Sequence, residues 1–111
     1  MSSMKKLHLA LGVADIEATV ADYSQRFGQA PELVIAGAYA LWRTDTLNVS
    51  VRKVAEEDAG KLRHLGWEVA GAEAFTSDLD CNGILWEQFA AEHQAAEIKD
   101  AWPEVSYEPE A

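Results

Sequence analysis

Residues 7–28, LHLALGVADIEATVADYSQRFG, carry the clearest hydrophobic pattern in this chain. From Leu7 to Val13, bulky apolar residues alternate with small or polar ones, which is typical of a strand with one apolar face. Apolar residues then recur at helical spacing over 16–27. Asp15 is well suited to cap the start of this helix, and Gly28 to end it. The pattern therefore predicts a strand that leads directly into an amphipathic helix.

Part of this pattern recurs in the second half of the chain. Residues 63–73, RHLGWEVAGAE, repeat residues 7–17, LHLALGVADIE, with five identities at one constant offset. The polar residue that both strands share is a histidine, His8 in the first and His64 in the second. We interpret the repeat as a duplicated module, although two unrelated apolar strands can also match by chance.

Most of the remaining pattern predicts strands, and together with the helices it predicts an α+β fold. After the first helix we expect strands over 32–35, 38–43 and 47–54, a charged linker over 56–61, and a second-copy strand over 62–70. An Asn-Gly pair at 82–83 predicts a hairpin that ends in a strand over 84–89. Helical spacing over 90–102, stopped by a proline, predicts a C-terminal helix before an acidic tail.

Length and charge limit the functional classes. The chain has 111 residues, of which 49% are hydrophobic, and this suits one domain, 1–111, with a substantial core. A net charge of −10 disfavours binding to nucleic acids and to anionic membranes. The sequence contains neither a signal-like segment nor an apolar run of membrane-spanning length, so we expect a cytoplasmic protein. Cys81 is the only cysteine, which excludes an intrachain disulfide.

Three residues are candidates for a metal site. His8, His64 and Glu87 each lie near the middle of a predicted strand and can face one concavity. Two neutral imidazoles and a carboxylate suit one divalent ion, such as iron, manganese, zinc, cobalt or nickel, and leave coordination positions open. Taken singly, each of these residues is more often structural or solvated than a metal ligand.

These same segments carry a family resemblance. The segments HLALGVADIEATVADYSQRFG, RHLGWEV and SDLDCNGILWEQF resemble the opening strand and helix, the central strand and the final hairpin of the vicinal oxygen chelate superfamily. This superfamily is also known as the glyoxalase, bleomycin-resistance and dioxygenase family. Within it, LHLALGV, AYALWRTDTLNVSV and RHLGWEV are most similar to the cadmium-induced and organoarsenical-lyase branch. The resemblance covers about residues 7–89.

The resemblance implies paired βαβββ modules whose sheet forms a cup around a metal. The usual ligands fall on His8, His64 and Glu87, and Ser50 is the counterpart of a fourth ligand that some members use. Module one spans about 5–55, module two about 61–89, and a C-terminal helix with the acidic tail spans 90–111. The second module is too short for its own helix and one strand. The cysteine pair of the organoarsenical lyases would lie in the missing part, so carbon–arsenic cleavage is not supported.

The sequence is compatible with two main functions. One is a metal-dependent enzyme (a dioxygenase, lyase or isomerase) that acts on a small oxygen-bearing substrate held in the cup; Glu68 is a candidate base, although a solvated strand-end residue is favoured. The alternative is a bleomycin-resistance-type protein that binds or sequesters a small molecule without turning it over. We expect Trp42, Ser50 and Phe89 to contact the ligand. A third hypothesis is a degenerate subunit that only associates with partners.

The truncated second module predicts an exposed apolar surface. Without a helix in this module, Leu65, Trp67 and Trp86 would lie on an uncovered sheet face. The C-terminal helix is long enough to cover that face, in its own chain or in a partner. We therefore expect a homodimer in which this helix packs on one of the two sheets.

Overall fold

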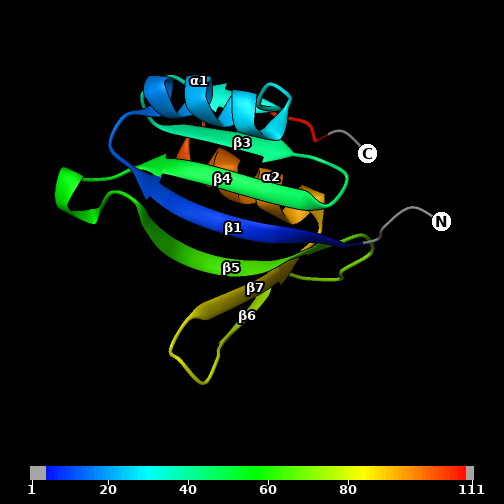
Figure 1. The fold of residues 1–111 in the computed structure, drawn as a ribbon. Coiled ribbons are helices and arrows are strands. Elements are labelled where there is room, and N and C mark those ends of the chain that lie inside the picture. Colours follow the sequence, from blue (N-terminus) through cyan, green and yellow to red (C-terminus); the bar gives the residue numbers. More distant parts are fainter. Residues whose placement is uncertain (1–4, 110–111) are drawn as a thin grey trace.

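The computed structural model describes residues 5–109, and its elements follow the predicted order (Figure 1). Within these residues, two α-helices, one short 3-10 helix and seven strands occur. They are β1 (Lys5–Val13), α1 (Ile16–Phe27), β2 (Leu33–Ile35), β3 (Tyr39–Arg43), β4 (Leu47–Lys53), η1 (Glu56–Asp58), β5 (Lys61–Val69), β6 (Thr76–Leu79), β7 (Leu85–Phe89) and α2 (Ala91–Ala101). The α+β fold class is confirmed. In the described part, no helix is both long and apolar enough to cross a membrane.

The caps predicted for α1 are present. The Asp15 side chain accepts a hydrogen bond of 3.0 Å from the Ala18 backbone N–H. Gly28 ends the helix with φ of 73°, a conformation that residues with a Cβ rarely adopt. The caps predicted from the sequence therefore coincide with the observed bounds of α1.

The strands form one mixed sheet in the order β2-β3-β4-β1-β5-β7-β6. At its centre β1 and β5 pair antiparallel, β4 lies parallel to β1, and β7 lies parallel to β5. The arrangement on one side of the central pair is thus repeated on the other, apart from the extra strand β2. No helix separates β5 from β6. This agrees with a second copy that lacks the helix of the first.

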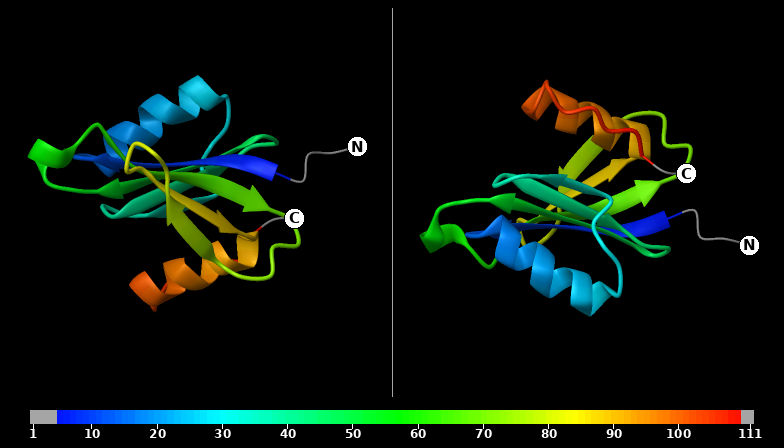
Figure 2. Two further views of the ribbon diagram at one scale, coloured as in Figure 1. Left: turned by 90° about the horizontal axis from the view of Figure 1, so that it is seen from below. Right: turned by 90° about the horizontal axis from the view of Figure 1, so that it is seen from above.

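The two helices lie on opposite faces of the sheet (Figure 2). α1 packs over β3 and β4, where Ile16, Trp42 and Val51 form part of a buried core. α2 packs on the other face, where Ile98 contacts Tyr39 and Leu41 in a second core cluster. The sheet is therefore buried on both faces over β3 and β4.

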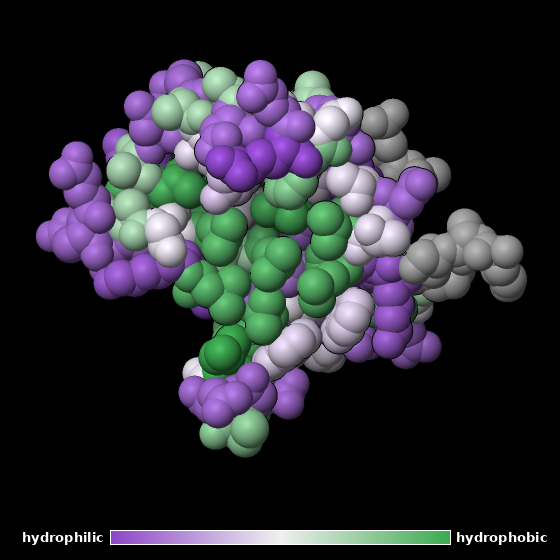
Figure 3. Space-filling view, viewed as in Figure 1, coloured by the Kyte–Doolittle hydropathy of each residue, from purple (hydrophilic) through white to green (hydrophobic). Residues whose placement is uncertain are grey.

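The C-terminal helix does not cover the face that the sequence predicted. Leu65, Trp67 and Trp86 remain only partly buried on the α1 face, where apolar side chains form a broad patch (Figure 3). α2 lies on the opposite face because the chain leaves β7 through Phe89 and Ala90, which are both buried there. One residue separates β7 from α2, so the helix cannot cross to the other face. The expected homodimer stays a prediction.

Candidate metal centre

The central strand pair positions the two histidines. His8 lies opposite Gly66, and His64 lies opposite Ala10. These pairs are related by the same offset as the sequence repeat, so each histidine faces a small residue of the other copy. The two imidazoles consequently meet on one face of the sheet, with ring centroids 5.0 Å apart.

Glu87 comes from β7 and lies opposite Gly66. A Cβ atom at Gly66 would meet the backbone carbonyl oxygen of Glu87 at 2.4 Å, which is well inside van der Waals contact. The absence of a side chain at this position therefore lets β7 approach β5 closely enough to bring the carboxylate beside the histidines.

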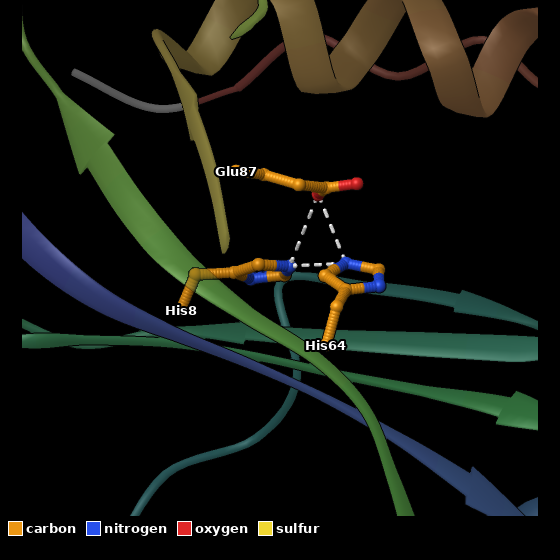
Figure 4. Close-up of side chains that lie close together, drawn as sticks. All are labelled: His8, His64 and Glu87. Carbon is orange, nitrogen blue, oxygen red and sulfur yellow. Dashed lines mark hydrogen bonds and ion pairs between the residues drawn. The ribbon is translucent and has the colours of Figure 1, made fainter. Parts of the chain in front are cut away.

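The three side chains point toward one another in the space between the sheet and α2 (Figure 4). His8 Nε2 lies 3.1 Å from His64 Nε2, and Glu87 Oε1 lies 2.9 Å from His64 Nε2 and 3.9 Å from His8 Nε2. His8 is buried, and the other two are half-buried. The structure thus brings together the three residues proposed as ligands.

The geometry and chemistry of this cluster fit one metal ion. Two ligand atoms that each lie about 2.1 Å from an ion are roughly 3.0–3.4 Å apart at right-angled or tetrahedral geometry. The three distances are 2.9, 3.1 and 3.9 Å, so the longest exceeds that range by about half an ångström. Two imidazole nitrogens and one carboxylate oxygen are donors that suit iron, zinc, manganese, cobalt or nickel. The His8, His64 and Glu87 triad can therefore hold one divalent ion.

Asn48 fixes the tautomer of His8. The Nδ1 atom of His8 lies 2.9 Å from the side-chain oxygen of Asn48 and 3.2 Å from its backbone oxygen. Because both partners are acceptors, Nδ1 carries the proton and Nε2 presents a lone pair to the site. Burial lowers the pKa of His8, and its hydrogen bond to Asn48 opposes this only in part. His8 is thus held neutral, as a metal ligand must be.

Asn48 is itself held from two sides. It is fully buried, and its side-chain nitrogen donates to Glu68 and to Gln94, at 2.8 Å each. Gln94, on α2, donates back to the side-chain oxygen of Asn48 at 3.2 Å. All polar atoms of the Asn48 side chain are engaged, so its orientation toward His8 is fixed by the fold.

Replacing Asn48 by alanine is expected to weaken metal affinity by about 10–100-fold, the usual effect of removing a residue that orients a ligand. His8 would lose the acceptor that sets its tautomer. Metal titration followed by a competing chelator measures the effect. Asn82→Ala, which changes the exposed hairpin turn, is the matched control. Equal affinity in both variants would show that Asn48 does not orient His8.

Glu68 is not a solvated residue. It is buried and receives two hydrogen bonds from Arg43, at 2.9 and 2.7 Å. Burial alone would raise the pKa of Glu68, but hydrogen bonds from Arg43 and Asn48 and the charge of Arg43 lower it overall. Arg43 also pairs with Glu32, which accepts a hydrogen bond from the Tyr107 hydroxyl. The interpretation of Glu68 as a solvated residue is therefore wrong, because Arg43 pairs with it in the buried sheet. Its role as a base stays a prediction.

A cavity of about 280 Å³ adjoins the cluster, between the sheet and α2. Polar side chains on its wall include Ser50, Arg52, Arg63 and Glu97, and the apolar part is formed by Phe75, Leu85, Phe89, Ile98, Ala101 and Trp102. Its volume is slightly below the usual range for drug-sized ligands, which is about 300–1,000 Å³. The cavity therefore suits a small molecule.

The residues expected to bind substrate divide between the two sheet faces. Ser50 and Phe89 line the cavity. Ser50 lies opposite Ala10, and Glu87 lies opposite Gly66, the residue equivalent to Ala10 in the repeat. The Ser50 hydroxyl therefore occupies the position in the first half that corresponds to the Glu87 carboxylate in the second. Trp42 lies on the opposite face, fully buried beneath α1, and does not reach the cavity. Its strand alternation places it with Ala40, away from the histidines.

The sequence interpretation missed Asn48 and Gln94. The alternation of β4 indicated that Asn48 shares a face with Ser50. The register that places it beside His8 depends on the parallel pairing of β1 and β4, for which the sequence has no local signal. Gln94 was not predicted, because the sequence does not show which sheet face α2 covers.

No known family model matches this chain, and a search of curated proteins finds no significant match.

Proposed function

We propose that this protein is a metal-dependent enzyme of the glyoxalase and dioxygenase type, which acts on a small oxygen-bearing substrate in the cavity beside the metal. The observation that carries the proposal is the convergence of His8, His64 and Glu87 from three strands within reach of one ion.

The arrangement of strands supports membership in the vicinal oxygen chelate superfamily. The first half runs as strand, helix and three strands, and the second half repeats the order without the helix and one strand. The symmetric pairing of β1 with β5 places equivalent histidines side by side. A duplicated and then shortened module accounts for both features.

Different residues of the chain would have different roles in such a site. A bound divalent ion would supply Lewis acidity toward neighbouring oxygens of a substrate. His8, His64 and Glu87 would hold the ion on one side, which leaves its other side facing the cavity. Asn48 holds the tautomer and the orientation of the His8 ring, and burial keeps His8 neutral. α2 forms one wall of the cavity, through residues that include Gln94, Glu97 and Ile98.

A binding protein of the bleomycin-resistance type is the second candidate. This function is favoured by the ion pair between Glu68 and Arg43. Glu68 is the carboxylate that the sequence suggested as a base, and Arg43 engages it. An apolar wall that includes Phe75, Phe89 and Trp102 can retain a small compound without catalysis. Turnover of a bound compound distinguishes the two functions.

Metal analysis tests the common basis of both functions. Protein purified without a chelator or a metal-affinity tag is expected to contain about one divalent ion per chain by elemental analysis, or to take up one when reloaded after dialysis against a chelator. Reloading with iron(II), manganese, cobalt, nickel and zinc in parallel identifies the preferred ion. A chain that retains no ion under any of these conditions would contradict the proposed function.

A further inference from the structure

A bulge in β5 turns an arginine toward the cavity. Ala10 lies opposite His64, but the next residue of β1, Leu11, lies opposite Leu62, so Arg63 is an extra residue between two pairs. In a regular strand, Arg63 would point away from the face that carries His64. The bulge instead allows both residues to line the cavity.

Arg52 reaches the same cavity from β4. Its guanidinium lies over the Trp102 ring, 5.0 Å from the ring centroid, and this contact holds it at the cavity wall. Arg52 lies opposite Tyr39, and the charges of Arg52 and Arg63 both act on the Tyr39 hydroxyl. Burial nevertheless raises the pKa of Tyr39 to about 12, so that its hydroxyl is uncharged at neutral pH. The two arginines therefore flank one neutral polar group.

Within the described part of the chain, neither arginine has an acidic partner. Among residues 5–109, the salt bridges of arginine involve Arg26 and Arg43 and include neither Arg52 nor Arg63. The chain nevertheless carries 19 acidic residues against nine lysines and arginines. With a divalent ion bound, the cavity would hold more positive charge than Glu87 and Glu97 can balance.

We propose that the cavity selects a small organic anion, whose carboxylate or phosphate group binds Arg52 and Arg63 while its neighbouring oxygens face the His8, His64 and Glu87 cluster. Guanidinium groups suit both kinds of anion because their donors match two oxygens at once. The proposal rests on the proposed metal site and names the class of ligand for it.

Matched pairs of compounds test the anionic group. 2-Oxoglutarate and 2-oxopentanoate share a metal-chelating end, but only the first has a distal carboxylate. 3-Phosphoglycerate and glycerate differ likewise by a phosphate. Calorimetric titration of the zinc-loaded protein is expected to show, in one pair, at least tenfold tighter binding of the member with the additional carboxylate or phosphate. The pair that shows this preference identifies the group.

Arginine variants test the residues. Arg63→Met is expected to reduce the preference about tenfold, and Arg63→Lys to restore part of it. Arg52→Met is expected to act similarly. Arg26→Met, on the exposed surface of α1, is the matched control and should leave the preference unchanged. Zinc content and circular dichroism establish that each variant is folded and loaded.

The outcomes separate this inference from the proposed function. Wild-type protein that takes up no zinc would contradict the metal site and overturn this inference with it. Zinc uptake without a preference for the additional carboxylate or phosphate in either pair would overturn this inference alone. A preference that survives Arg63→Met and Arg52→Met together would also overturn it.

Discussion

Replacing His64 by alanine is expected to abolish stoichiometric metal binding. His64 is one of the three proposed ligands, and its Nε2 lies within 3.1 Å of the ligand atoms of the other two. Loss of the ligand would leave a nitrogen and an oxygen 3.9 Å apart, too few to bind a divalent ion against a chelator. Elemental analysis of wild-type and variant protein after the same reloading and desalting measures the loss.

His93→Ala is the matched control for this experiment. His93 is the third histidine of the chain, and its ring accepts a hydrogen bond from the Ala90 N–H at the start of α2. It lies outside the metal cluster, so its replacement should leave metal content unchanged. Retention of about one ion per chain in His64→Ala would refute the ligand assignment. Glu87→Gln is expected to weaken binding as well, because the ion would lose its only charged ligand.

Replacing Arg43 by methionine is expected to lower the free energy of unfolding by about 3–5 kcal/mol, the usual effect of removing one partner of a buried ion pair. The Arg43 side chain is 6% exposed and pairs with Glu68 and Glu32, whose side chains are 8% and 10% exposed. The variant would leave both carboxylates without their cation. Chemical denaturation at pH 7 measures the loss, and a fall in melting temperature on the order of 10 °C should accompany it.

The effect of Arg43→Met should depend on pH in a defined direction. The pKa of Glu68 is lowered in the folded protein, so its ion pair contributes stability above the ordinary carboxyl pKa, and this is lost as pH falls through the lowered value. Acid also neutralises the carboxylates left unpaired in the variant. The stability difference should therefore shrink below about pH 4.5. Arg26→Met, which breaks an exposed pair with Asp22, should change stability by less than about 1 kcal/mol at any pH.

A small, pH-independent effect of Arg43→Met would show that the Arg43 network is not a source of stability. The network also links the C-terminal segment to the cluster, since Tyr107 contacts Glu32 and Glu68 contacts Asn48. Metal affinity measured on folded Arg43→Met protein reports whether this link affects His8 through Asn48.

The sequence by itself determined the local elements and the face of each strand. The bounds of α1 follow from Asp15 and Gly28, because a side-chain cap and a left-handed glycine act within a few residues of the helix ends. The repeat placed His8 and His64 on equivalent strand faces, because side chains alternate with a period of two in any strand. Convergence of the two histidines then required the pairing of β1 with β5, and convergence with Glu87 also required the pairing of β5 with β7.

Only the tertiary structure decided what surrounds those residues. Periodicity assigns a residue to one of two faces but does not say which face a later helix will cover, so the position of α2 and the role of Gln94 depended on the short connection after β7. Likewise, the sequence predicted that Trp42 contacts the ligand, and only the strand pairing places this residue under α1.

Strand register and bulges were also beyond the sequence. The pairing of Asn48 with His8 and the ion pair of Glu68 with Arg43 join strands that are distant in the chain. The bulge at Arg63 reverses the face that simple alternation predicts. Such features arise from hydrogen bonding between strands, and each is settled by the sum of many contacts across the sheet. The sequence therefore determined the ligand types and their strands, whereas the folded sheet decided their partners and the cavity beside them.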